Sequence, residues 1–178
     1  IRFDVVEAPR MFEVFLCGRA YDEVVHLASR VCGICAVSHR CAALKATEAA
    51  LGVTVSGQTR RLRRLAFLGE ILSSHVLHAF FLVAPDLYEV PDVFHLADGH
   101  RDMVRRAMWL KQLAYDLCGC IAGRHTHPTA MVVGGFTCAQ RPADLARMGS
   151  RLQAAGDDLR ALAAWLKDRP WPEYERET

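Results

Sequence analysis

The sequence predicts a mainly α fold of long packed helices with a small β element near the amino terminus. Apolar residues recur at three- and four-residue steps over three long stretches, and strong helix formers fill a fourth. Only the first six residues alternate apolar and charged side chains with β-branched content. Hydrophobic residues make up 52% of the 178, which is enough for one sizeable core. We therefore expect residues 1–178 to form a single domain.

The amino-terminal part is expected to consist of short elements. Residues 1–6 predict a strand, closed by the proline of "EAPR", and a short helix follows at 10–17. The stretch "CGRAYDEV" is expected to be a loop. From Ser38 onward, strong helix formers predict a helix that ends at Gly52, with Ser38 or a neighbour capping its start.

Three longer helices are expected further on. The first runs from Thr59 to about Val83 and is stopped by Pro85; its end, residues 77–84, is apolar nearly all round and should be buried. The second covers 98–122. The stretch "AGRHTHPTAMVVGGFT" is a short strand with tight turns or a loop. The last helix starts near Pro142, and its narrow apolar seam from Leu145 to Leu166 predicts packing against one partner helix.

Charge and cysteine usage narrow the class of protein. The net charge of +2 gives no sign of nucleic-acid binding, and the run "RRLRR" at 60–64 fits a solvated helix face or a subunit contact. No apolar stretch is long enough to predict a membrane span, and no signal core is evident at the start. The seven cysteines are odd in number and irregularly spaced, which favours free thiols in a reducing, cytoplasmic compartment.

The stretch "SRVCGICAVSH", residues 29–39, carries the clearest chemical signal. A C-x-x-C can hold structural zinc, but zinc needs two further ligands, and no second C-x-x-C is present. His125 and His127 are too close together for the usual zinc-finger spacing and are expected to be structural or to support ligands. A thioredoxin-like redox pair would need alternating strands, which the pattern lacks.

A third interpretation takes "RVCGICAVSH" as one motif around a metal. Gly33 would let the backbone turn so that both sulfurs face one centre. His39 lies about one helical turn after Cys35, where it can donate a hydrogen bond to a sulfur. Arg30 adds positive charge beside an anionic cluster.

This stretch resembles the amino-terminal metal-binding motif of the large, catalytic subunit of nickel–iron hydrogenases. Residues 7–19, "EAPRMFEVFLCGR", and residues 124–136, "RHTHPTAMVVGGF", look like signature stretches of that family in the expected order. "GEILSSHVLHAFFLVAPDLYEV" is similar to a helix of its cytoplasmic, cofactor-linked branch. The resemblance covers nearly the whole chain and implies an amino-terminal portion of a larger catalytic subunit.

The resemblance implies a nickel–iron centre that carries carbonyl and cyanide on the iron and acts on dihydrogen. Four cysteines hold the nickel in the family, and by matching position Cys32 would be a terminal ligand and Cys35 a bridge to iron. His39 would hydrogen-bond a bridging sulfur, and Arg30 would stand beside the cluster. Electrons would pass to an iron–sulfur small subunit in a hetero-oligomer. The second cysteine pair is not in this chain, so it carries half a site and should be inactive alone.

A competing class also remains open. A non-catalytic C-x-x-C helical protein could bind structural zinc, or act as an electron-transfer or assembly relative without nickel. Retention of both motif cysteines together with His39 favours the enzyme, because a relative that has lost the metal needs none of the three.

Overall fold

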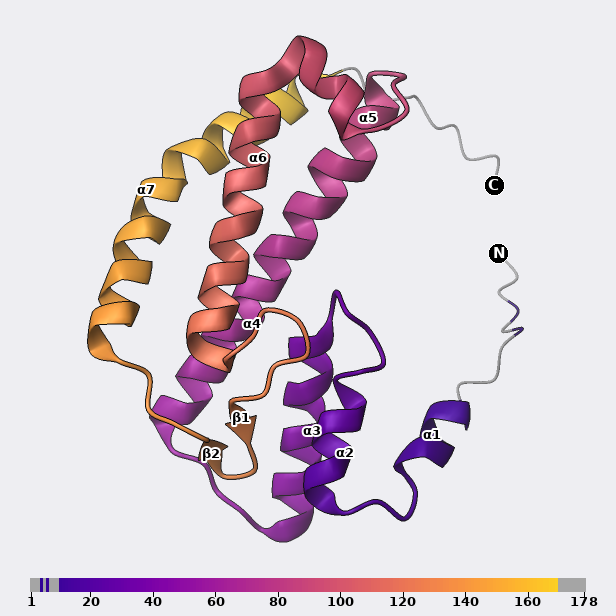
Figure 1. Ribbon diagram of the computed structural model, residues 1–178, viewed down its shortest axis with the longest axis vertical. Coiled ribbons are helices and arrows are strands. Elements are labelled where there is room, and N and C mark those ends of the chain that lie inside the picture. Colours follow the sequence, from indigo (N-terminus) through magenta and orange to yellow (C-terminus); the bar gives the residue numbers. More distant parts are fainter. Residues whose placement is uncertain (1–3, 5, 7–9, 170–178) are drawn as a thin grey trace, which may run out of the picture. The chain divides into compact units, whose positions relative to one another are not determined.

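A computed structural model describes residues 4, 6 and 10–169 of the chain (Figure 1). It is mainly helical with one small sheet, which confirms the predicted fold class. The strand predicted at 1–6 lies outside the described residues, apart from Asp4 and Val6, which have no regular structure. The described residues fall into two compact units, Ile1–Glu70 with Cys118–Gln140 and Ile71–Leu117 with Arg141–Thr178. The single domain expected over residues 1–178 stays a prediction.

The first unit contains three complete helices: α1 (Arg10–Leu16), α2 (Tyr21–Ala28) and α3 (Ala36–Leu51). The prediction of α1 is confirmed, and α3 ends as expected at Gly52, whose φ of 66° is the left-handed conformation that glycine adopts freely. The prediction of a loop over "CGRAYDEV" is wrong at its end, because α2 begins at Tyr21. The Glu23 carboxylate accepts the Ala20 N–H at 3.2 Å, which caps this first turn.

The first unit also contains the start of α4 (Gly57–Leu77), the end of α6 (Val93–Ala122) and a hairpin. Strands β1 (Met131–Val132) and β2 (Gly135–Phe136) pair antiparallel, with Met131 opposite Phe136. Gly134 in the turn has a φ of 83°, which a residue with a side chain adopts only under strain. Of the two predicted alternatives for this segment, the short strand with a tight turn is therefore the one observed.

The second unit follows α4 through a change of helix type. After Leu77 the chain forms a π-helical stretch, η1 (His78–Val83), and then α5 (Ala84–Leu87), so the prediction that Pro85 stops the helix is wrong. The Ala84 N–H donates to the carbonyl of Ala79, five residues back. The widened π register comes just before a residue that lacks an N–H, and it lets Pro85 occupy the first turn of α5.

The remaining helices of the second unit are α6 through Leu117 and α7 (Pro142–Lys167). α6 begins at Val93, earlier than predicted, because the Asp92 carboxylate accepts the N–H groups of Phe94 and His95 at 2.9 and 3.0 Å. A non-helical His100 kinks it. The helix predicted from Pro142 is confirmed as α7.

Apolar side chains from these helices form one core in the second unit. It includes Val76, Phe80, Ala84, Val93, Leu96, Met103, Val104, Ala107, Leu110, Leu113, Ala155 and Leu162. Trp165 of α7 stacks on Tyr88 with ring centroids 5.2 Å apart. Only one face of residues 77–84 is buried, since Leu82 is 54% exposed. The prediction that this end is buried all round is therefore wrong.

One helical run, Gly57–Leu87, is long and apolar enough to cross a membrane when judged by length and composition alone. That contrasts with the prediction of no membrane span. Long core helices of other proteins have the same length and composition. This run also buries the polar side chains of Arg63, Glu70 and Ser73 against the protein.

Candidate metal centre

The C-x-x-C motif lies in the loop between α2 and α3 of the first unit. α2 ends at Ala28, and the N–H groups of Arg30 and Val31 still donate to the carbonyls of Leu27 and Ala28, so a hydrogen-bonded turn leads from the helix to Cys32. Cys35 is the N-cap residue of α3, and its N–H donates to Cys32 Sγ at 3.4 Å. This bond closes the turn, and it brings two half-buried cysteines together at the start of a helix.

The two thiols differ in acidity. The thiol of Cys35 hydrogen-bonds the sulfur of Cys32, which lowers the pKa of Cys32, and the Cys35 N–H adds to this effect. The same thiol–thiol hydrogen bond, followed by burial, raises the pKa of Cys35 to about 11. Cys32 therefore ionises first and Cys35 is its donor. Two sulfurs close enough to share a proton are also close enough to bind one metal ion.

The structure does not require a glycine within the motif. Gly33 is not among the glycines with positive φ, which are Gly18, Gly52, Gly123 and Gly134. A Cβ at position 33 would meet only Thr126 Cγ2, at an ordinary 3.9 Å. The expectation that Gly33 supplies an unusual turn is wrong, because the hydrogen bond from the Cys35 N–H to Cys32 closes the turn.

The start of α3 is held by an acid from another helix. Glu70 of α4 is only 7% exposed, and its carboxylate accepts the N–H groups of Val37 and Ser38 at 2.6 and 3.0 Å. The hydroxyl of Ser38 also donates to it. The prediction that Ser38 or a neighbour caps α3 is wrong, because the Ser38 hydroxyl donates to Glu70 and the N-cap residue, Cys35, makes no side-chain cap bond. Nothing local in the sequence pointed to Glu70.

His39 and Arg30 lie on either side of the thiols along the chain. His39 is half-buried in the first turn of α3, and its N–H donates to the Cys35 carbonyl at 3.1 Å. Arg30 is exposed and helps to line a small pocket of about 140 Å³ with Phe12 and Phe15 of α1. Both residues are close to the motif in the chain, and their predicted roles at a metal stay predictions.

The loop from Gly123 to Ala130 supports the end of α2. His127 has a positive φ of 50°, and its Nδ1 lies 2.7 Å from the Ser29 carbonyl, to which it can donate. Thr126 is the residue that faces Gly33. The loop thus contacts the chain on both sides of Cys32, which agrees with the structural role expected for His127.

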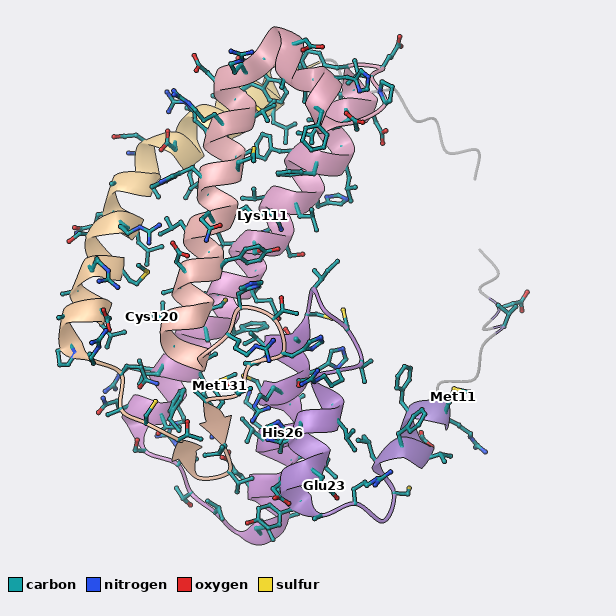
Figure 2. All side chains as sticks on the ribbon, in the orientation of Figure 1. Met11, Glu23, His26, Lys111, Cys120 and Met131 are labelled. Atoms are coloured by element: carbon teal, nitrogen blue, oxygen red, sulfur yellow. The ribbon has the colours of Figure 1, made fainter. Side chains whose placement is uncertain are left out.

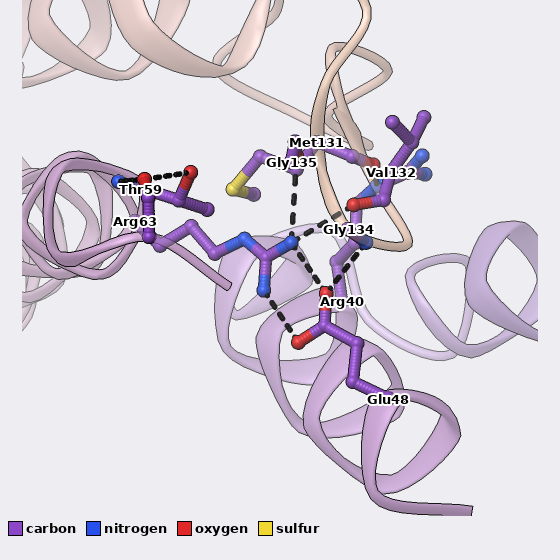
Figure 3. Close-up of polar contacts among 9 residues, drawn as sticks. Arg40, Glu48, Thr59, Arg63, Met131, Val132, Gly134 and Gly135 are labelled. Atoms are coloured by element: carbon purple, nitrogen blue, oxygen red, sulfur yellow. Dashed lines mark hydrogen bonds and ion pairs between the residues drawn. The ribbon is translucent and has the colours of Figure 1, made fainter. Parts of the chain in front are cut away.

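A buried ion pair joins α3, α4 and the hairpin (Figure 3). Arg63 donates to both carboxylate oxygens of Glu48 at 2.9 and 2.7 Å and to the Val132 carbonyl at 2.8 Å. The Gly134 N–H donates to the same carboxylate at 2.9 Å. Since Arg63 is 7% exposed, the expectation that "RRLRR" is wholly a solvated face or subunit contact is wrong at this position.

A second buried arginine ties α3 to α2 and the hairpin. Arg40 is 1% exposed; its Nε donates to the Met131 carbonyl at 2.7 Å, and its Nη1 lies 3.1 Å from His26 Nδ1. Figure 2 labels the two partners, His26 and Met131. Burial, followed by the charges of Arg40 and Arg30, lowers the pKa of His26. Because arginine can only donate, the neutral His26 ring accepts at Nδ1.

No group of three or more histidine, cysteine or acidic side chains that could hold a metal occurs among the residues that the structure describes. His75 and His78 are both exposed rather than packed in a core. A structural zinc site would need two ligands beyond Cys32 and Cys35, so the zinc alternative is not favoured. The thiol pair fits one half of a metal site built from soft ligands.

Comparisons with known proteins agree with this arrangement. A family model described as nickel-dependent hydrogenase matches residues 10–105. The alpha chain of sulfhydrogenase 2 from Pyrococcus furiosus is 37% identical over 135 residues, which is 76% of this chain and 33% of the relative. A chain of the vhu F420-non-reducing hydrogenase from Methanocaldococcus jannaschii is 34% identical over 137 residues, or 73% of this chain and 33% of the relative.

Solved structures show the same fold. An NAD+-reducing NiFe hydrogenase in the H2-reduced state aligns with a TM-score of 0.83 and 34% identity, covering 91% of this chain and 38% of that one. The as-isolated oxidised Ni-Fe-Se hydrogenase of D. vulgaris Hildenborough aligns with a TM-score of 0.79 and 25% identity, covering 90% and 36%. The fold of this chain is therefore that of part of a nickel–iron hydrogenase large subunit.

The chain belongs to the nickel-dependent hydrogenase family, whose model covers residues 10–105. It spans about a third of the length of the curated relatives it matches. The characteristic cofactor of that family is a nickel–iron centre, and two soft thiols at the start of α3 suit such a centre chemically.

Proposed function

We propose that this chain forms the amino-terminal part of the catalytic large subunit of a nickel–iron hydrogenase. The reaction is the reversible oxidation of dihydrogen to protons and electrons. The observation that supports it is the pair of hydrogen-bonded, half-buried cysteines at the start of α3, inside the region that the nickel-dependent hydrogenase model matches.

In this proposal the sulfurs of Cys32 and Cys35 would hold the nickel–iron group. When bound, the nickel–iron group supplies the redox chemistry at which dihydrogen is split. Cys32 suits early binding of the metal because its lowered pKa favours the thiolate. The Cys35 thiol, whose pKa is raised to about 11, would have to give up its proton to act as a ligand. His39 would donate a hydrogen bond to a bridging sulfur, and Arg30 would balance negative charge.

The chain supplies two of the four thiolates that the family uses, so the complete large subunit must supply the others. Electrons would pass to an iron–sulfur small subunit in a hetero-oligomer. We also propose a cytoplasmic location, because seven irregularly spaced cysteines do not resemble a disulfide framework and suit a reducing compartment. Cell fractionation tests the location: recovery of the protein with periplasmic markers would contradict it.

The ligand assignment is tested in the complete large subunit once it is assembled with its small partner. We expect Cys32→Ser and Cys35→Ser each to abolish bound nickel and hydrogen-dependent dye reduction. Cys138→Ser is the matched control, because Cys138 is an exposed free thiol. Nickel content and activity equal to wild type in both motif variants would refute the assignment.

The half-site idea has its own test. Residues 1–178 purified alone and supplied with nickel and iron should show no hydrogen-dependent dye reduction, because two thiolates leave the metal open to exchange. Dye reduction above that of a Cys35→Ser control would mean that this part of the chain is sufficient.

A further inference from the structure

Among the residues that the structure describes, Glu70 is a buried acid whose side chain accepts hydrogen bonds from the first turn of α3. One carboxylate oxygen accepts the Val37 N–H, and the other accepts the N–H and the hydroxyl of Ser38. Three donors around one carboxylate suit its ionised, accepting form. Because Glu70 lies 32 residues or more from its partners, this contact is purely tertiary.

The first turn of α3 needs such an acceptor. The first N–H groups of a helix have no partner within the helix, and they are normally capped by an oxygen of the N-cap side chain. Here the N-cap residue is Cys35, which makes no side-chain cap bond. The side chain of Cys35 therefore does not cap α3. The carboxylate of Glu70 accepts the N–H groups of the first turn in its place.

The charge of Glu70 is held next to the motif. Its carboxylate accepts the N–H of Val37, two residues after Cys35, and the N–H of Ser38, three residues after it. A carboxylate fixed at this point can act on charge held at the two sulfurs. Its position is fixed by the same hydrogen bonds that hold residues 37 and 38.

We propose that Glu70 is a positioning residue of the metal centre: it fixes the α3 turn that follows Cys35 and places a negative charge behind the two sulfurs, which makes a metal held by them richer in electrons. This inference rests on the proposed function for the presence of the metal. It assigns to Glu70 two separable effects, one on the backbone of α3 and one on the electron density of the centre.

The test uses the complete large subunit, bound to its small partner, and three variants. Glu70→Gln keeps the shape and removes the charge. Glu70→Asp keeps the charge but withdraws the carboxylate by one methylene, and Ser38→Ala removes one donor and leaves Glu70 in place. Infrared spectroscopy measures the stretching frequencies of the carbonyl and cyanide on the iron, and a redox titration measures the midpoint potential of the centre. Amide hydrogen exchange measures the exchange rates of the Val37 and Ser38 N–H groups.

We expect Glu70→Gln to move the carbonyl and cyanide stretches to higher wavenumber and the midpoint potential to more positive values, because less charge reaches the iron. Loss of a helix cap should speed exchange of the Val37 and Ser38 amides by about fivefold or more in Glu70→Asp and Glu70→Gln. Ser38→Ala should leave the stretches where they are. If Glu70→Gln fails to assemble, Glu70→Asp should still show a smaller shift in the same direction.

Stretches, potential and amide exchange that are unchanged in Glu70→Gln, or in Glu70→Asp where the former does not assemble, would overturn the inference. Faster exchange with unmoved stretches and potential would overturn the electronic half of it. Wild-type protein without carbonyl and cyanide bands would instead refute the proposed function, so the two failures are distinguishable.

Discussion

The two units of the chain are stabilised by different means. The first unit buries Arg40, Glu48, Arg63 and Glu70, all charged, whereas the described part of the second unit buries no charged residue. The second unit is held by an apolar cluster on α6 and its neighbours. The unit that carries the thiol pair thus fixes its loops with directional hydrogen bonds, and the other relies on non-directional packing.

This difference follows from what each unit must hold in place. Apolar packing tolerates small shifts, but a pair of metal ligands on a loop needs its backbone held at defined positions. Four side chains contact backbone groups of the hairpin, of the α2 end or of the α3 start. They are those of Arg40, Arg63, His127 and Glu70. The buried charges therefore act on the segments around the motif rather than on the core alone.

The largest expected effect is the loss of a buried charge partner in the first unit. Glu48→Ala leaves Arg63 buried without its carboxylate and the Gly134 N–H without its acceptor, so we expect about 3–5 kcal/mol of destabilisation. Denaturant unfolding of the chain measures it. Asp157→Ala, which breaks the exposed pair with Arg160, is the control and should cost nothing measurable. Equal costs for the two variants would contradict the comparison.

In the second unit the large effect should come from a cavity. Leu110 is fully buried, and Leu110→Ala should destabilise the chain by about 2–5 kcal/mol because its contacts are lost and the site collapses only partly. Met108 on the same helix is 53% exposed, and Met108→Ala should stay within about 0.5 kcal/mol. The same unfolding measurement compares them, and a Met108 variant as unstable as the Leu110 variant would argue against this apolar core.

Acid should weaken the first unit through Glu48. Burial by itself raises the pKa of Glu48, but the hydrogen bonds from Arg63 and the Gly134 N–H outweigh it, so the pKa is lowered from 4.5. A lowered pKa in the folded state means that the stabilisation is fully present above about 4.5 and is lost as the pH falls through the folded value. We expect the stability gap between wild type and Glu48→Gln to shrink below that pH. A gap that stays constant down to strong acid would contradict this assignment.

The smallest expected effect concerns two glycines of the first unit. Gly33→Ala should change stability by no more than about 0.5 kcal/mol, because its backbone does not need positive φ and the new Cβ meets an ordinary contact. Gly134→Ala should cost about 1 kcal/mol or more, since its φ of 83° strains any residue with a side chain. Thermal unfolding separates them. The reverse order would show that the motif turn is tighter than it is in this structure.

Much of the helical content was predictable because it depends on local patterns. The periodic apolar residues of α4, α6 and α7 and the terminal glycine of α3 act over a few residues. Some errors were also local: Glu23 at α2 and Asp92 at α6 are caps visible in the sequence. The π-helical stretch before Pro85 was not predictable, because "LHAFFLVA" has the same pattern in either helix type.

The sequence by itself determined the family, the helical class and the two thiols with His39 and Arg30 beside them, because those features depend on residue type and short spacing. Only the tertiary structure decided how the motif is held. Glu70 reaches α3 across 32 residues and more, His127 reaches Ser29 across 98, and Arg63 is buried although the other arginines of "RRLRR" are exposed. A hydrogen bond between distant segments produces no periodic pattern in the sequence of either segment. Its partners can therefore be identified only in the folded structure.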